Sequence, residues 1–140
     1  MYNTLFCIDD EPISLMISKK IISKTAFAKE VITALNGEEA LRMYDSFKKN
    51  TSKNTSSIPE LIFLDLNMPV VMGGWKFLEL FTSEHYSEFN NVKVIILSST
   101  IDPQDLAKAK AFSLVADFLP KPITVGVLDY SKEKFNNQKA

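Results

Sequence analysis

The sequence predicts an α/β protein with a doubly wound sheet of five parallel strands and five helices. Five short apolar, β-like runs alternate along the chain with stretches of helical periodicity, and this alternation is typical of a βα repeat with right-handed crossovers. Two of the runs, Leu61–Leu64 and Val92–Leu97, are nearly continuous in apolar residues, as expected of strands buried on both faces. The chain has 140 residues, so we expect residues 1–140 to form a single domain.

The first strand and helix are predicted by the run Leu5–Ile8 and by Pro12. Proline suits an early helical position, where no intrahelical partner exists for an N–H group. Four apolar side chains after it recur at helical spacing and mark one face of a first crossover helix. They are Ile13, Met16, Ile17 and Ile21.

The second strand is predicted over Val31–Leu35, and the helix after it is expected to begin near Gly37. Asn36 and Glu39 have the spacing of a capping box, which marks a helix start. Four apolar residues supply the buried stripe of this helix. They are Ala40, Leu41, Tyr44 and Phe47.

The remaining elements follow the same alternation. A third helix is expected after the glycine pair at 73–74, and a fourth after Asp102, whose side chain is a favoured N-cap. Their apolar faces consist of Trp75, Phe77, Leu78 and Phe81 in the third and of Leu106, Ala109 and Phe112 in the fourth. The run Leu114–Leu119 predicts the fifth strand, and a last helix is expected after Thr124.

Two polar segments are expected outside these elements. The stretch at about 48–58 is rich in Ser, Thr, Asn and Lys, which is typical of a solvated surface loop, with a basic interaction loop as the alternative. Residues from about 136 to 140 are expected to form a short polar tail.

Composition and charge limit the classes of function. The formal net charge is -1, so no overall basic field attracts nucleic acid or a membrane surface. No stretch approaches the ~18 apolar residues of a membrane span, and the first residues lack the pattern of a secretory leader. Cys7 is the only cysteine and is expected to be a buried small hydrophobe, which fits a reducing compartment. We therefore expect a cytoplasmic protein that contacts neither nucleic acid nor a membrane directly.

Five polar residues stand at the ends of the apolar runs. They are Asp9, Asp10, Asp65, Ser98 and Lys121. Since parallel strands open their carboxyl ends onto one crevice, we expect these side chains to converge. Two carboxylates ~4 Å apart repel by about 4 kcal/mol at an effective dielectric near 20, so three of them require a counter-charge. Mg²⁺ is the predicted partner because it takes oxygen ligands from one or two carboxylates together with phosphate oxygens.

A metal, a lysine and a hydroxyl around one carboxylate are the groups that phosphoryl transfer requires. Asp65 is the predicted acceptor, because carboxylates serve as covalent nucleophiles for phosphoryl groups. Lys121 and Ser98 are predicted to contact the phosphoryl oxygens. His85, the only histidine, has no acid or nucleophile beside it in sequence and receives no catalytic role.

In these motifs the sequence resembles the response-regulator receiver domains of two-component signalling. The acidic pair lies in Ile8–Pro12, the phosphoacceptor in Leu64–Pro69, the hydroxyl in Leu97–Ser99 and the lysine in Lys121–Pro122. The four motifs agree with the family in order and spacing and span nearly the whole chain. The resemblance implies a stand-alone, CheY-like receiver with a flavodoxin-like (βα)5 fold and the strand order 2-1-3-4-5.

The resemblance also implies roles for the residues at the predicted site. Asp65 would take the phosphoryl group from a phosphohistidine, Asp10 would ligate Mg²⁺ directly, and Asp9 would act largely through water. Asn67 would offer its backbone carbonyl to the metal. Lys121 would pair with the phosphoryl group, and Ser98 would turn toward it.

Further residues acquire roles only through this resemblance. Phe118 would be the aromatic that moves inward on activation, with packing in the core as the alternative. Asn67 and Thr100 would tune the lifetime of the phosphoryl group. The bond between Lys121 and Pro122 is often cis in such proteins.

The sequence departs from the family pattern in two places. Threonine is more frequent than serine at the position of Ser98, and the adjacent Ser99 leaves open which of the two is the switch hydroxyl, because a slip of one residue reverses side-chain direction along a strand. The segment 69–74 is one residue longer than the usual loop after the phosphoacceptor.

The expected function is a signalling switch that catalyses only its own phosphorylation and dephosphorylation. Its partners would be a sensor histidine kinase or a histidine phosphotransferase and an unknown downstream protein, reached through the fourth helix, fifth strand and fifth helix. An intermediate phosphorelay carrier is the main alternative. Two others are a small aspartyl-phosphate phosphohydrolase, which usually has a second acid where Asn67 stands, and a binding module that is never phosphorylated.

Overall fold

The strands form one five-stranded sheet in the order β2-β1-β3-β4-β5. The computed structural model describes residues 2–49, 58–68, 72–100 and 102–139, with side chains as far as residue 134. The strands are β1 (Tyr2–Ile8), β2 (Ala28–Ala34), β3 (Leu61–Asp65), β4 (Lys93–Ser98) and β5 (Val115–Pro120). The helices are α1 (Pro12–Lys24), α2 (Gly37–Lys49), α3 (Gly74–Phe81), the 3₁₀ helix η2 (Glu84–Phe89), α4 (Pro103–Ala109) and α5 (Val125–Lys139).

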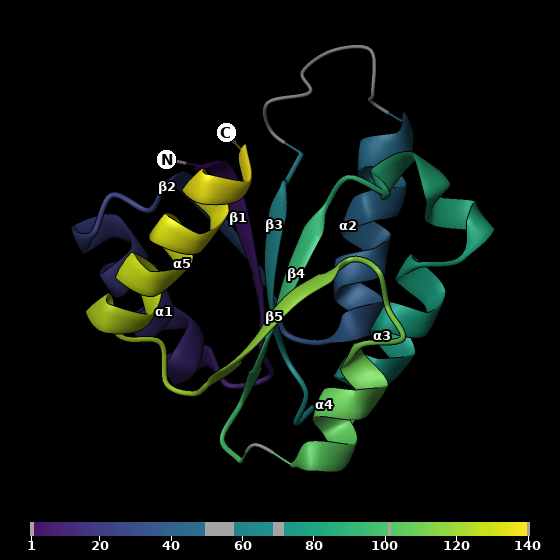
Figure 1. Cartoon of the computed structure of the whole chain (residues 1–140). Coiled ribbons are helices and arrows are strands. Elements are labelled where there is room, and N and C mark those ends of the chain that lie inside the picture. Colours follow the sequence, from purple (N-terminus) through teal and green to yellow (C-terminus); the bar gives the residue numbers. More distant parts are fainter. Residues whose placement is uncertain (1, 50–57, 69–71, 101, 140) are drawn as a thin grey trace.

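The helices cover both faces of the sheet. Figure 1 shows α1 and α5 on one face and α2, α3 and α4 on the other. All four strand pairings are parallel, so the carboxyl ends of β1, β3, β4 and β5 lie at one edge of the sheet. The predicted fold class and strand order are thereby confirmed.

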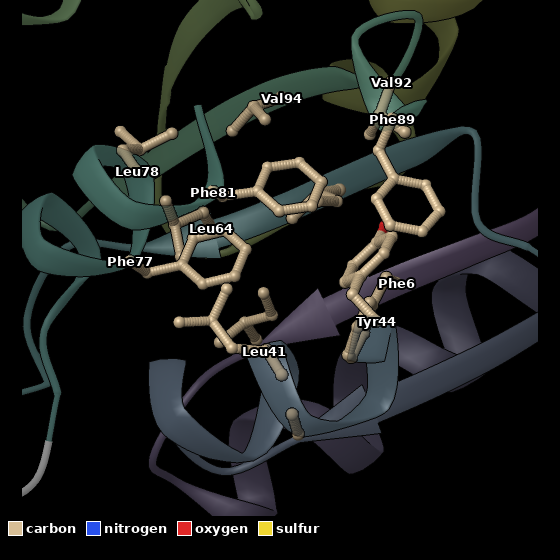
Figure 2. Close-up of a cluster of buried hydrophobic side chains, with 14 of the residues drawn as sticks. Phe6, Leu41, Tyr44, Leu64, Phe77, Leu78, Phe81, Phe89, Val92 and Val94 are labelled. Atoms are coloured by element: carbon tan, nitrogen blue, oxygen red, sulfur yellow. The ribbon is translucent and has the colours of Figure 1, made fainter. Parts of the chain in front are cut away.

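The larger core lies between the sheet and the layer of α2 and α3. Tyr44 of α2 is fully buried there, and its ring centroid lies 4.6 Å from that of Phe81 in α3 and 4.8 Å from that of Phe89 in η2 (Figure 2). Such close aromatic pairs add to the stabilisation that burial of apolar area supplies. The sequence pattern did not predict η2, which is held in place by this aromatic packing.

Two of the predicted helix starts are confirmed by their capping hydrogen bonds. The Asn36 side chain accepts a hydrogen bond from the Glu39 N–H at 2.8 Å, and α2 begins at Gly37. Asp102 directly precedes α4, and its side chain accepts a hydrogen bond from the Gln104 N–H at 2.9 Å. Each side chain satisfies an N–H group that has no partner within its helix.

The apolar face predicted for α1 lies largely at the surface. Ile13, Met16 and Ile17 are 68%, 51% and 45% exposed, whereas Leu15 and Ile22 are 7% and 0% exposed. Leu15 and Ile22 are seven residues apart, which places them on one side of the helix, and they pack in the smaller core on the sheet face that α1 covers. Helix α1 therefore has apolar residues on two sides, and periodicity alone did not identify the side that the sheet buries.

The boundaries of the polar segments differ from the prediction. Helix α5 continues to Lys139, so residues 136–139 of the expected tail are helical, and residue 140 lies outside the described residues. These four residues include neither Gly nor Pro, the residues that most often end a helix. Lys48 and Lys49 belong to α2 rather than to the polar loop. Residues 50–57 of that loop and residues 69–71 of the longer loop lie outside the described residues. Within the described residues, no helix is long and apolar enough to cross a membrane.

The orientation of α1 yields a prediction about stability. Ile22→Ala should lower the free energy of unfolding by about 2–5 kcal/mol, because it leaves a cavity at a fully buried site. The same substitution at Ile17, which is 45% exposed, should change it by about 0.5 kcal/mol or less. Urea denaturation of both variants tests this difference, and equal losses would mean that the two sides of α1 are equally packed.

Candidate functional site

The four strand ends bring the predicted polar residues together at one edge of the sheet. Asp9 directly follows β1, and Lys121 directly follows β5. Asp65 and Ser98 are the last residues of β3 and β4. The juxtaposition that the sequence predicted is therefore present.

Three carboxylates form a cluster at this edge. Oxygen atoms of Asp9, Asp10 and Asp65 all lie within 4.8 Å of one another. Asp9 and Asp65 are buried, with 7% and 2% of their surfaces exposed, and Asp10 is half-buried. Removing carboxylates from water is costly unless each has a partner.

Lys121 is the cation within this cluster. Its Nζ lies 2.7 Å from Asp9 Oδ2 and 3.2 Å from Asp65 Oδ2, and its backbone N–H donates to the Ser98 carbonyl at 2.9 Å. The peptide bond between Lys121 and Pro122 is cis, as the resemblance implied. Lys121 thus joins the ends of β1, β3 and β4 from its position after β5.

Burial and neighbouring charges shift the pKa values of Asp65 and Lys121. Burial raises the pKa of Asp65 to about 6; the Asn67 N–H bond opposes this shift, the Asp9 charge adds to it, and Lys121 opposes it. Burial lowers the pKa of Lys121, but the hydrogen bond to Asp9 and the charges of Asp65 and Asp9 outweigh it and raise the pKa above its usual value. Near neutral pH Asp65 is therefore mainly a carboxylate beside an ammonium group.

The donor set fits a hard divalent cation. The clustered ligand atoms of Asp9, Asp10 and Asp65 are all oxygens, the type that Mg²⁺ prefers. Three ionised carboxylates against the single charge of Lys121 leave the cluster negative. The residues present would hold Mg²⁺ through these carboxylates.

The two serines after β4 have different surroundings. Ser98 is buried, and its hydroxyl accepts from the Thr100 N–H and donates to the Thr100 carbonyl. Ser99 is exposed, and its Oγ accepts from Asn67 Nδ2 at 3.4 Å. The assignment of Ser98 rather than Ser99 as the switch hydroxyl stays a prediction.

A cavity of about 270 Å³ opens beside Asp65, and all but one of the residues that line it have polar side chains. The sequence reasoning assigned no role to two residues that line it, Glu11 and Ser14. The Glu11 N–H donates to Asp9 Oδ1 at 3.0 Å, so Glu11 helps to orient one carboxylate of the cluster. The sequence does contain a signal for Glu11. Because proline favours the first position of a helix, Pro12 indicates that Glu11 is the N-cap of α1 and therefore lies at the strand end beside Asp9.

Phe118 and His85 lie away from the carboxylate cluster. Phe118 in β5 is half-buried, packs against the larger core and pairs in register with Ile96 of β4. His85 is in η2, before β4 begins, and its Nε2 lies 3.5 Å from Asp45. Cys7 is buried, as predicted, and burial raises the pKa of its thiol to about 12.

Comparison with known proteins gives a family match over most of the chain. The family model described as the response regulator receiver domain matches residues 5–130. No curated protein sequence matched the chain.

Solved structures share the fold. A two-component response regulator from Cytophaga hutchinsonii is 29% identical, with a TM-score of 0.83 over 97% of this chain and 98% of that one. A two-component response regulator from Legionella pneumophila is 21% identical, with a TM-score of 0.75 over 98% and 99% of the two chains. A CheY-like receiver domain protein from Methanospirillum hungatei JF-1 is 18% identical, with a TM-score of 0.74 over 99% and 98%. The last two likenesses speak to the fold alone.

The raised pKa of Asp65 predicts how substitution of this residue changes stability with pH. The folded-state pKa, about 6, lies above the ordinary value of 3.8, so the stability gained by protonating Asp65 is fully present below the ordinary value and is lost as pH rises through the folded-state value. Without divalent cations, Asp65→Asn should therefore raise Tm at pH 8, by an amount equivalent to about 1–2 kcal/mol. The gain should shrink at pH 5.

Differential scanning calorimetry in EDTA measures both effects. Asp129→Asn removes an exposed carboxylate of α5 and is the matched control, for which we expect little change at either pH. A Tm for Asp65→Asn at or below that of the wild type at pH 8 would contradict the prediction.

Proposed function

This chain belongs to the response regulator receiver domain family of two-component signalling, and we propose that it is a switch operated by phosphorylation of Asp65. The observation that carries the proposal is the placement of Asp65: a buried carboxylate at the end of β3, 3.2 Å from the Nζ of Lys121 and clustered with Asp9 and Asp10. A nucleophile, an ammonium group and two further carboxylates are thereby within reach of one phosphoryl group.

Asp65 is proposed to attack the phosphorus atom of a phosphohistidine. A bond forms from a carboxylate oxygen to phosphorus while the bond from phosphorus to the histidine nitrogen breaks, and the imidazole leaves with the electron pair of that bond. The attacking group must be ionised, and at pH 7 Asp65 is mainly so because its pKa is about 6. A burial-raised pKa also makes the oxygen more basic than that of an exposed aspartate.

The Lys121 ammonium group is proposed to change its partner during the transfer, from the carboxylates to the phosphoryl oxygens. In the unphosphorylated protein its ammonium group contacts both Asp65 and Asp9. Once Asp65 carries a phosphoryl group, the new oxygens bear a charge of roughly -1.5 to -2 and become the stronger partners. Lys121 then holds the phosphoryl group against the end of β3.

Asp9, Asp10 and Asp65 are proposed to hold Mg²⁺, with the backbone carbonyl of Asn67 as a further ligand. When bound, the ion supplies positive charge that offsets the charge on the transferring oxygens. The oxygen-only cluster supports this proposal. Lys121 partly balances the cluster in the absence of a metal.

The switch is proposed to act through Ser98 and Phe118. The Ser98 hydroxyl is engaged with Thr100, so contact with a phosphoryl group requires it to leave that turn. The Ser98 carbonyl accepts a hydrogen bond from the Lys121 N–H, so a movement of either residue would displace the other. Phe118, half-buried beside β4, is proposed to move inward into space that this rearrangement opens.

Partner contact is proposed on two surfaces. The exposed Ile13, Met16 and Ile17 of α1 follow the acidic pair in the chain and support docking of a protein phosphodonor near Asp65, since exposed apolar side chains grouped together mark interaction surfaces. Val125 and Tyr130, also exposed, support an output surface that includes α5. The proposed phosphodonor is a sensor histidine kinase or a histidine phosphotransferase, and in a phosphorelay the latter would also receive the phosphoryl group.

Incubation with acetyl phosphate tests the proposal. With Mg²⁺ the wild type and Asp129→Asn should form an acid-stable, hydroxylamine-labile phosphoprotein, seen as a retarded band on a phosphate-affinity gel. Asp65→Asn should remain unlabelled. EDTA should lower the initial rate of labelling of the wild type by at least tenfold, which corresponds to a rise of about 1.4 kcal/mol or more in the activation free energy.

Three other outcomes each have a clear meaning. An unlabelled wild type, under conditions that label a control receiver, would refute the switch and favour a binding module that is never phosphorylated. Labelling of Asp65→Asn equal to that of the wild type would refute Asp65 as the acceptor. Rapid turnover of varied phosphomonoesters would support a phosphohydrolase instead.

A further inference from the structure

A groove of about 590 Å³ lies between α1 and the start of α2. Helix α1 supplies five of the described lining residues, and β2, its connection to α2 and α2 itself supply the others. Because α1 and α2 cover opposite faces of the sheet and β2 is an edge strand (Figure 1), the groove lies along the β2 edge. Its volume is in the range of ligand sites on proteins, roughly 300–1,000 Å³.

The groove presents apolar side chains to solvent. Met16 of α1 and Leu35, which follows β2, both line it and are 51% and 42% exposed. Exposed apolar side chains that gather around one groove are typical of an interaction site. Of the three α1 residues proposed to meet the phosphodonor, only Met16 lines the groove, whereas Ile13 and Ile17 do not. The groove is therefore distinct from that side of α1.

The groove also carries an excess of positive charge. Among the described residues that line it, the charged ones are Lys19 and Lys20 of α1 and Glu39 of α2. Both lysines are exposed, and neither forms an ion pair with any residue that the structure describes. The helix dipole favours lysine only within the last turn, which in α1 contains Lys24. The dipole therefore does not account for the two lysines of the groove.

We propose that this groove docks a partner protein through an acidic segment that carries large apolar side chains. The apolar side chains of the segment would cover Met16 and Leu35, and carboxylates beside them would pair with Lys19 and Lys20. Charge complementarity of this kind favours acidic partners and rejects basic ones. The interaction goes beyond phosphorylation of Asp65 and does not depend on it, since no described residue lines both the groove and the Asp65 cavity.

Selection from a display library of random linear peptides tests the proposal. The immobilised full chain is the target, and peptides that also bind Leu35→Gln are removed. The enriched peptides should combine acidic residues with large apolar ones. The most enriched peptide is then labelled with fluorescein, and its affinity for each variant is measured by fluorescence anisotropy.

Matched variants separate the groove from the rest of the surface. Leu35→Gln and Lys19→Glu should each weaken binding of the peptide by about fivefold or more, because each removes a main contact of the segment. Two controls should change the affinity by less than about twofold, because they lie outside the groove. They are Ile17→Gln, at a site of similar exposure to Leu35, and Lys110→Glu, at an exposed lysine that directly follows α4. Raising the salt concentration should weaken binding to the wild type more than to Lys19→Glu.

Several results would overturn the proposal. Enriched peptides without an excess of acidic residues, or an unchanged affinity in Lys19→Glu, would exclude an acidic partner. An equal loss in Ile17→Gln and Leu35→Gln, or a failure to enrich any peptide that distinguishes Leu35→Gln from the wild type, would exclude the groove. A wild-type dimer in sedimentation velocity that Leu35→Gln dissociates would identify a second copy of this chain as the occupant instead. Tm values show that each variant is folded.

Discussion

Repulsion among three carboxylates at one edge of the sheet determines which other groups the site must contain. Parallel pairing of β1 and β3 brings carboxylate oxygens of Asp9, Asp10 and Asp65 within 4.8 Å of one another, where each pair repels by several kcal/mol at the dielectric of a protein surface. The fold tolerates this because Lys121 enters the cluster from the end of β5. The same negative excess makes the site suited to a divalent cation, whose positive charge would in turn attract the oxygens of a phosphoryl group.

Lys121 also connects the carboxylate cluster to the end of β4. Its ammonium group faces Asp9 and Asp65, while its backbone N–H is bonded to the Ser98 carbonyl. A change of charge at Asp65 is therefore proposed to alter a contact at the end of β5 and, through one hydrogen bond, to shift the end of β4. Phe118 lies in β5, three residues before Lys121, and packs against the larger core. A movement of Lys121 could therefore change the packing of Phe118, as the proposed switch requires.

The strand ends were predictable from the sequence, and the helix surfaces were not. A carboxylate that follows a buried run must lie at a strand exit or have a partner, which placed Asp65 and Asp9 correctly. For α1, the spacing of Ile13, Met16 and Ile17 predicted an apolar face, but the sheet buries Leu15 and Ile22, because apolar periodicity does not distinguish a core face from a surface face. The orientation of Ser98 and Ser99 depended on the turn to Thr100, which no local pattern specified.

Chemical identification of the phosphorylated residue would show whether the phosphoryl group resides on Asp65. Sodium borohydride reduces an aspartyl phosphate to homoserine, which tandem mass spectrometry locates in the peptide sequence. After phosphorylation of the wild type in Mg²⁺, we expect homoserine at position 65 and unmodified side chains at Asp9 and Asp10. Homoserine at position 9 or 10 instead, or a stable phosphate on Ser98 or Ser99, would contradict it.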